Sequence, residues 1–332
     1  MLARLARFQT PSLLRSVVQL VTTAAPYAAS IAFMYYAYYH LSPWISLALA
    51  LPTAGLVVRL FIIQHDCGHG SFFRSRWANE SVGSVCSLMT FTPFALWRRH
   101  HAAHHAIWNN LDKRPGGGDI YSSCMTLQEY EALSPLRQRL YRAALNPLVS
   151  QLLLPPVLFL LLYRIPFDTP TAWRKERITV YLTNLGLGAL LATLIVLLGW
   201  RSVLLVQLPV IVLASIIGVW LFSVQHRFEG SLWTRQPEWS SIGASLKGSS
   251  WLRLPRVLQW FTGNIGFHHV HHLLPRVPNY RLQACHASDP AFAETVTGLS
   301  FWQALRAPGF TLFDEENGRM VKFPPRRSSR VR

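Results

Sequence analysis

Long apolar stretches dominate the hydrophobic pattern of this chain. Four of them reach or approach the roughly 20 residues that an α-helix needs to cross a hydrocarbon core of about 30 Å. These stretches are residues 16–39, 44–64, 178–200 and 203–223. The pattern therefore predicts four membrane-spanning helices.

Two further apolar stretches are interrupted. Residues 148–163 carry Pro155 and Pro156 at their middle, which remove backbone donors and would kink a spanning helix. Residues 78–96 are interrupted by Gly83, two threonines and a proline. Both stretches favour interfacial or re-entrant helices over full crossings.

Composition supports an all-α integral membrane protein. Of the 332 residues, 51% are hydrophobic and only 14% are charged. The net charge of +17 is unevenly placed, because the short connections 40–43 and 200–202 hold one basic residue, Arg201, whereas the N-terminus and the longer loops are basic. Since cytoplasmic loops carry the excess of Lys and Arg, the short connections are predicted to face outward. This topology accounts for most of the charge, and no nucleic-acid-binding module is visible.

The predicted organisation is a single membrane domain, residues 1–320, with cytoplasmic segments at 65–145 and 226–320 and a basic, disordered tail at 321–332. The first apolar stretch is too long for a signal-peptide core and lacks a small-residue cleavage site, so it is expected to remain as a spanning helix. The four cysteines form no CxxC pair, and disulfides are not expected on the predicted reducing side.

Most of the 13 histidines fall into three tight groups beside the apolar stretches. Their spacings are HxxxH at 65–69, HxxHH at 101–105 and HxxHH at 268–272, which together supply eight imidazoles. Residues three and four apart share one face of a helix, so each group can present its rings toward one point. Eight ligands exceed the needs of one ion, so two metal ions are predicted. Imidazole suits iron, copper, nickel and zinc, and a neutral, all-nitrogen set beside the bilayer favours an oxygen-activating iron centre.

Other residues near these groups have weaker signals. His100 and His269 adjoin candidate ligands but point to other helix faces, so they are expected to support the ligands or to face solvent. His40 and His286 lie outside the spacing and are expected to be structural. Asp66, inside the first group, is the candidate acceptor for the second N–H of a metal-bound imidazole.

Four motifs carry a resemblance to a known family. They are HDCGH at 65–69, HAAHH at 101–105 preceded by a tryptophan, NLD at 110–112, and GNIG at 263–266 leading into HHVHH at 268–272. In this order and spacing they resemble the membrane fatty acid desaturases, and most closely the acyl-lipid, omega-6 (delta-12) type of bacteria and plastids. The resemblance covers roughly residues 59–282. Asn109 departs from it, because glycine is expected there.

The resemblance implies a di-iron enzyme that uses dioxygen and two electrons to remove two hydrogens from an acyl chain, leaving a cis double bond and water. It adds His226, between the second and third groups, as a further ligand; the alternative is an interfacial histidine bonded to lipid phosphate. Asn264 is expected either near a metal, directly or through water, or as a helix N-cap. The full ligand set it implies is His65, His69, His101, His104, His105, His226, His268, His271 and His272.

The resemblance also implies the partners. The substrate is a fatty acyl lipid, and because no His-Pro-Gly-Gly haem motif is present, electrons come from a separate ferredoxin or cytochrome b5 type protein. The basic face is a candidate docking surface for an acidic donor. The expected location is the bacterial inner membrane, with the histidines facing the cytoplasm.

Two alternatives remain open from the sequence. The same three-group scaffold resembles alkyl hydroxylases and carotenoid hydroxylases or ketolases, which leave an alcohol or a ketone in place of a double bond. A histidine-rich metal transporter is the alternative from another class. It would require ionisable residues along the spans, where Arg59 is almost alone.

Overall fold

Four long helices form the frame of the molecule, and the computed structural model describes residues 2–114, 121 and 123–325. The long helices are α2 (Leu13–His40), α3 (Pro43–His69), α9 (Arg174–Leu198) and α10 (Trp200–His226). Each is long and apolar enough to cross a membrane, which confirms the predicted spans. The chain is an integral membrane protein.

The helices α3 and α10 run further than their apolar stretches. The apolar pattern ends near residues 64 and 223, whereas α3 continues to His69 and α10 to His226. The first histidine pair and His226 therefore stand on the last turns of spanning helices. Helix α3 ends at Gly70, which has φ 66 and donates its N–H to the carbonyls of Asp66 and Cys67.

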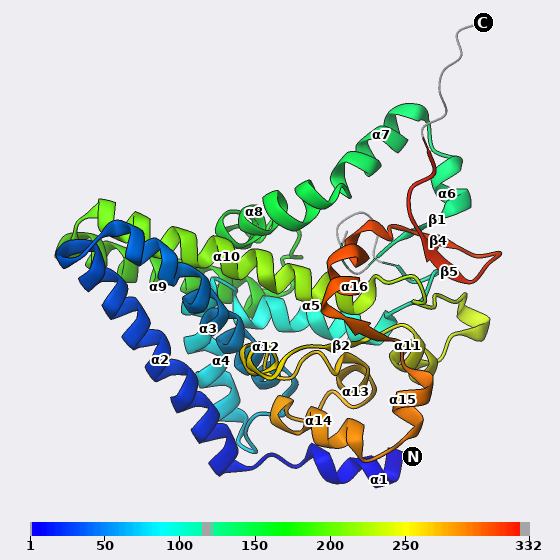
Figure 1. Cartoon of the computed structure of the whole chain (residues 1–332), viewed down its shortest axis with the longest axis horizontal. Coiled ribbons are helices and arrows are strands. Elements are labelled where there is room, and N and C mark those ends of the chain that lie inside the picture. The colour runs from blue at the N-terminus through cyan, green and yellow to red at the C-terminus, as the bar shows by residue number, and fades with distance from the viewer. Residues whose placement is uncertain (1, 115–120, 122, 326–332) are drawn as a thin grey trace, which may run out of the picture.

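Shorter helices pack around the four long helices and beyond the ends of α3 and α10 that carry histidines (Figure 1). They are α1 (Leu2–Leu5), α4 (Arg76–Thr90), α5 (Phe94–Ile107), α6 (Leu127–Glu131), α7 (Pro135–Ala144), α8 (Leu154–Leu160), α11 (Ser241–Lys247), α12 (Arg256–Phe261), α13 (His268–Leu273), α14 (Asn279–Ala287), α15 (Ala291–Thr295) and α16 (Phe301–Arg306). Short 3-10 turns are Ala6–Gln9, Leu162–Arg164, Gln236–Glu238 and Ala307–Gly309.

Two small sheets, which the sequence did not predict, join segments near the basic end. Strand β1 (Met125–Thr126) pairs in parallel with β4 (Leu312–Asp314), which pairs antiparallel with β5 (Arg319–Val321). Strands β2 (Trp251–Arg253) and β3 (Gly298–Ser300) form a parallel pair. The predicted tail 321–332 begins at the end of β5, and its residues 326–332 lie outside the described residues.

The two interrupted apolar stretches form bent helical segments. Residues 78–96 lie in α4 and α5, which are separated by a turn at Phe91, where φ is 56. Residues 148–163 begin with a π-helical turn, Leu148–Leu153, and continue as α8. Pro155 lies in the first turn of α8, where no N–H donor is needed. This segment and α7 are bent by 47° relative to each other, as in a broken span or a re-entrant loop.

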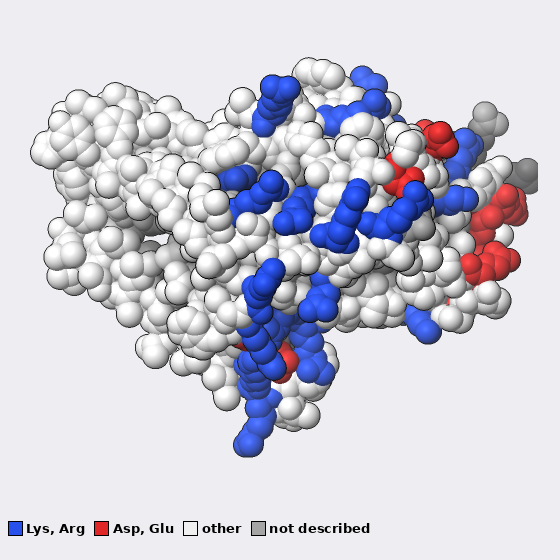
Figure 2. Space-filling view, turned by 90° about the horizontal axis from the view of Figure 1, so that it is seen from below, with Lys and Arg blue, Asp and Glu red and all other residues white. Residues whose placement is uncertain are grey.

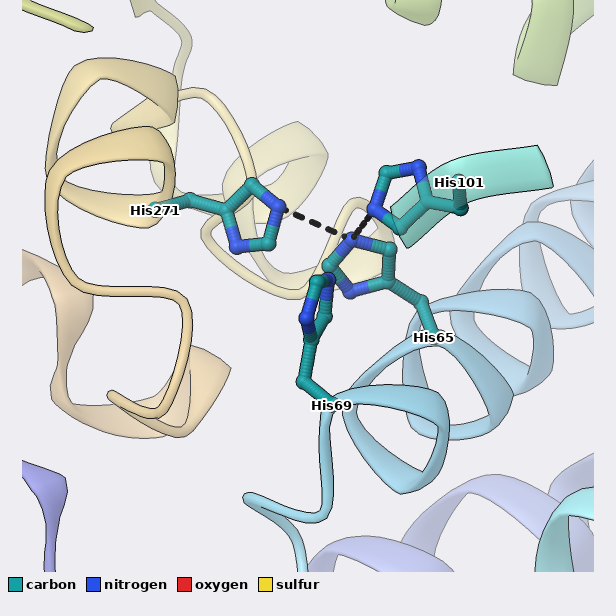
Figure 3. A group of neighbouring side chains, drawn as sticks. All are labelled: His65, His69, His101 and His271. Carbon is teal, nitrogen blue, oxygen red and sulfur yellow. Dashed lines mark hydrogen bonds between the residues drawn. The ribbon is translucent and has the colours of Figure 1, made fainter. Parts of the chain in front are cut away.

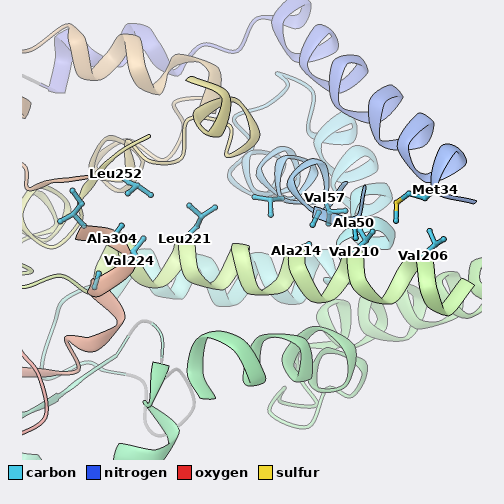
Figure 4. Close-up of a cluster of buried hydrophobic side chains, with 14 of the residues drawn as sticks. Met34, Ala50, Val57, Val206, Val210, Ala214, Leu221, Val224, Leu252 and Ala304 are labelled. Carbon is cyan, nitrogen blue, oxygen red and sulfur yellow. The ribbon is translucent and has the colours of Figure 1, made fainter. Parts of the chain in front are cut away.

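The core lies between α3 and α10, with α2 and α4 packed against α3. Its buried apolar side chains run along both long helices toward the short ones (Figure 4). Arg59, the charged residue at the middle of α3, donates hydrogen bonds to Thr23 of α2 and to the backbone carbonyl of Trp260, whose ring it also covers at 4.1 Å. It therefore ties α2, α3 and α12 together with neutral partners.

Glycine at position 83 lets α4 approach α5 closely. A Cβ at Gly83 would lie 2.4 Å from the ring of Phe94, which is buried. We expect Gly83→Ala to destabilise the fold by about 1–3 kcal/mol, because the Phe94 ring must shift. The measurement is thermal unfolding in detergent.

The matched control for this change is Gly188→Ala, which lies on an exposed face of α9 where an added Cβ meets no atom within 4 Å. It should leave stability within about 0.5 kcal/mol of the wild type. Equal stabilities of the two variants would show that Phe94 does not require glycine at position 83.

Charge is concentrated at one end of the molecule. In Figure 2, Lys and Arg gather over the central and right-hand parts of the face, whereas the far ends of the long helices at the left are white. This uneven distribution of Lys and Arg agrees with the predicted orientation, in which the basic end faces the cytoplasm. The histidine groups lie toward the basic end.

Candidate metal centre

Nine histidines from four helices meet at the C-terminal ends of α3 and α10. Helix α3 supplies His65 and His69, which lie one turn apart, and α10 supplies its last residue, His226. Helices α5 and α13 supply three each: His101, His104, His105, His268, His271 and His272. All nine predicted ligands therefore come together, although the sequence separates them by more than 200 residues.

Four imidazoles form a closed ring. The Nε2 atom of His65 lies 3.0 Å from that of His101 and 3.1 Å from that of His271. The Nε2 atom of His105 closes the ring at 3.1 Å from His101 and 2.9 Å from His271. Figure 3 shows His65, His101 and His271 pointing toward one another from α3, α5 and α13. Neighbouring nitrogens 2.9–3.1 Å apart are close enough to bind one ion together through metal–imidazole bonds of about 2.1 Å.

His69 covers this ring. Its centroid lies 4.7 Å from that of His65, 4.9 Å from those of His101 and His105, and 4.8 Å from that of His271. Its Nε2 atom is buried and has no hydrogen-bond partner among the described residues, which is costly unless a cation binds it. Ligand atoms of His65, His69, His101 and His271 all lie within 4.8 Å of one another. The ring and His69, called the five-histidine group below, can hold a metal ion.

A second group contains the other four histidines. The Nε2 atom of His226 lies 3.1 Å from that of His104 and 2.9 Å from that of His268, which lies 3.1 Å from that of His272. Ligand atoms of His104, His226 and His272 are mutually within 4.8 Å. This four-histidine group can hold a second ion. His226 is fully buried here, so it does not face lipid phosphate.

Consecutive residues serve different groups, which sets the two groups side by side. His104 and His105 diverge on α5, and His271 and His272 diverge on α13. The rings of His105 and His272 stack across the boundary with centroids 4.2 Å apart. Two ions held here would be neighbours in one shared cage.

Burial keeps these imidazoles in the metal-binding form. It lowers the pKa of His101, His105, His271 and His272 well below the usual 6.5, and neighbouring histidines lower it further. Neutral imidazole is the form that binds metal ions. The histidines are therefore ready to bind without first losing a proton.

Asp66 contacts His65, as expected for the acceptor of its second ring N–H. Its Oδ1 atom lies 3.2 Å from Nδ1 of His65, while Oδ2 accepts hydrogen bonds from the backbone N–H and the side-chain amide of Asn279, at 2.7 and 2.8 Å. A carboxylate at Nδ1 holds the proton on that nitrogen and leaves the lone pair of Nε2 facing the ring. The role of Asn279 had no signal in the sequence, because only the fold brings α14 to Asp66.

Asn264 lies in the left-handed region, with φ 59. Its amide donates to the backbone carbonyl of Asn279 and accepts from the side chain of Gln259. Helix α13 has Phe267 at its N-cap, so Asn264 does not cap it. Contact between Asn264 and a metal, direct or through water, stays a prediction. Asn109, which stands where glycine was expected, also has a positive φ of 58, a conformation that asparagine tolerates.

The remaining histidines divide as follows. His269 is buried and its Nε2 lies 2.9 Å from Nδ1 of His286, so it neither faces solvent nor points at the groups. His100 is half-buried, with its ring 6.4 Å from that of Trp173. His40 lies exposed at the far end of α2, beside Tyr36.

Two tryptophans pack on the histidines. Trp97 stacks on His101 at 4.7 Å with an interplanar angle of 15°. Trp108 lies 3.8 Å from the ring of His226 and 4.8 Å from that of His104. Trp97 is the tryptophan that precedes the second histidine motif; the contact of Trp108 had no signal in the sequence, because an aromatic residue beside a membrane is usually part of the core or the interface.

An apolar cavity of about 690 Å³ reaches both groups. Side chains of α3, α5, α8 and α10 line it, and His65, His101, His104 and His268 stand along its wall. Its volume lies within the range of ligand-binding cavities. The site therefore combines two adjoining histidine groups, each able to hold a metal ion, with one apolar cavity.

Comparison with known proteins agrees with this geometry. Residues 42–304 match the family model described as fatty acid desaturase. The chain is 41% identical, over 320 residues, to a protein named fatty acid desaturase from Bacillus subtilis (strain 168), covering 96% of this chain and 89% of that one.

More distant relatives have more specific names. An sn-1 oleoyl-lipid 12-desaturase from Synechocystis sp. is 25% identical over 251 residues, covering 74% of this chain and 69% of that one. An sn-1 acyl-lipid omega-3 desaturase (ferredoxin) from Nostoc sp. is 28% identical over 250 residues, covering 71% and 65%. Because the family model spans most of the chain and the Bacillus protein matches nearly all of it, this chain belongs to the fatty acid desaturase family.

Proposed function

We propose that the chain is a di-iron, oxygen-dependent desaturase that introduces a cis double bond into the acyl chain of a membrane lipid. The observation that carries the proposal is the pair of adjoining histidine groups at the wall of one apolar cavity. Family membership favours desaturation over the hydroxylase and ketolase alternatives.

The two groups divide the proposed ligands. One iron is held by His65, His69, His101, His105 and His271, and the other by His104, His226, His268 and His272. Imidazole suits iron. Because these ligands are neutral, they leave the positive charge of the ions uncompensated, which favours reduction of the ions by an electron donor. When bound, the iron pair supplies the oxidising power of dioxygen for removing hydrogen from an unactivated carbon.

The reaction balances with an external donor. Two adjacent C–H bonds of the acyl chain break and a C=C bond forms, while one O2, two electrons and two protons complete the formation of two waters. A ferredoxin or cytochrome b5 type protein supplies the electrons, and the name of the Nostoc relative includes ferredoxin. The basic end of this chain suits an acidic donor.

The protein's own side chains position the substrate. The apolar walls hold the acyl chain extended past His65 and His268 and exclude water from the reacting carbons. Trp97 restricts the ring of His101 by stacking on it, and Trp108 restricts the ring of His226 by a tilted contact. Asp66 fixes the ring of His65.

The finer assignments rest on similarity. The omega-6, or delta-12, position follows the motif resemblance and the name of the Synechocystis relative, whereas the name of the more similar Bacillus relative gives no bond position. Location in a bacterial inner membrane, with the histidines in the cytoplasm, follows the charge asymmetry.

The decisive experiment is expression with a ferredoxin and its reductase in a host that makes only saturated and monounsaturated lipids. We expect new double bonds in membrane lipid, located by mass spectrometry, and none when the ferredoxin is omitted. An alcohol or ketone in place of the double bond would refute desaturation, and a bond at another carbon would refute the omega-6 assignment alone.

A further inference from the structure

The wall of the cavity formed by α10 has a gap. Ile211, Ser215, Gly218 and Phe222 recur every three or four residues, and all four line the cavity. A Cβ built on Gly218 would meet no atom of the described residues within 4 Å. The cavity therefore reaches the backbone of α10 at this position.

Helix packing does not explain this glycine. Glycine in a spanning helix commonly lets a neighbour approach, as at Gly55, where a Cβ would lie 2.7 Å from the ring of Phe261. Gly218 has no such neighbour among the described residues, and glycine is a poor helix former. A side chain at this position would instead occupy space in the cavity.

The distance between Gly218 and His226 can be compared with the length of an acyl chain. Gly218 precedes His226 by eight residues, which is about 12 Å along the helix axis. An extended hydrocarbon chain advances about 1.25 Å per methylene, from C–C bonds of about 1.5 Å at tetrahedral angles, so a methyl-side segment longer than about nine or ten methylenes must pass Gly218, whereas the shorter methyl-side segment of an omega-6 product ends before it.

The direction of the acyl chain follows from the cavity lining. Arg114 and Asp168 border the cavity from loops outside the long helices, whereas Val57, Ile211 and Gly218 belong to spanning helices. A lipid keeps its polar end at the surface, because burying it among apolar side chains is costly. The methyl end of the acyl chain therefore extends along α10 toward Gly218.

We propose that Gly218 determines how many carbons fit between the new double bond and the methyl end of the acyl chain. The inference rests on the proposed desaturase function. It assigns a specificity role to one position: a larger side chain at 218 shortens the space available to the methyl-side segment.

The test compares Gly218→Ala and Gly218→Leu with the matched control Gly188→Leu, another open glycine position within a spanning helix but on the exposed face of α9. Each variant is expressed with its electron donor in cells fed a graded series of saturated and monounsaturated fatty acids. The products are quantified by chain length and by the number of carbons from the double bond to the methyl end, and iron content is measured on the purified proteins.

We expect Gly218→Leu to lower the ratio of long to short methyl-side segments by about tenfold or more, with a smaller shift for Gly218→Ala and none for Gly188→Leu. Iron content should be unchanged in all three. An unchanged product profile, or an equal loss of every product with normal iron content, would overturn the role of Gly218. Absence of any double bond with the wild type would instead overturn the proposed function, and this inference with it.

Discussion

Replacement of His271 with alanine is expected to abolish desaturation and to remove one of the two irons. His271 contributes one corner of the closed ring, 3.1 Å from His65 and 2.9 Å from His105. Without His271, the five-histidine group keeps four imidazoles and loses one of the nitrogens close enough to share an ion with His65 and His105. The loss of affinity should exceed the roughly 10–100-fold that the removal of a supporting residue costs. Iron per chain, measured by elemental analysis, should fall from two toward one.

The complementary change is His104→Ala in the four-histidine group. It should also abolish product formation, while the remaining iron is held by the other group. The control is His40→Ala, because His40 is exposed at the opposite end of the span, and the 22 helical steps from Pro43 to His65 in α3 cover about 33 Å. Full activity or a full complement of iron in His271→Ala would refute the ligand assignment.

Much of the frame could be predicted from the sequence. The four spans follow from uninterrupted apolar stretches, because a bilayer demands about 20 apolar residues whatever the rest of the fold does. The ends of α3 and α10 could not be placed, since the mainly polar residues 65–69 and the polar residues Gln225 and His226 end the apolar pattern but not the helix. Buried partners of the histidines stabilise these last turns.

The histidine groups show where local spacing stops being informative. Spacing on a helix identifies which imidazoles share a face, but not which ion each one reaches. His104 and His105 belong to different groups because His104 contacts His226 of α10, whereas His105 contacts His271 of α13. The pairing of His269 with His286 had the same cause: α14 folds back beside α13.

Asp66→Asn is expected to weaken iron binding by about 10–100-fold without changing any ligand. Asp66 is buried, and its two oxygens face three N–H groups, one on His65 and two on Asn279. An asparagine keeps the shape but has one acceptor oxygen and an NH2 group. Whichever way the amide turns, an N–H meets either the His65 ring or the two donors of Asn279. The ring of His65 then loses the contact that keeps its Nε2 lone pair toward the metal.

Two readouts separate the effect on the metal from an effect on the fold. The unsatisfied buried donor should also lower stability by about 1–3 kcal/mol, measured by unfolding of the metal-free protein. The control Asp289→Asn changes a carboxylate that lies 3.7 Å from the exposed Arg4, where an ion pair contributes little. If Asp66→Asn lowered stability but bound iron as tightly as the wild type, Asp66 would serve only to hold α14. Weakened binding with His65 in place would instead show that the carboxylate acts through the orientation of that ring.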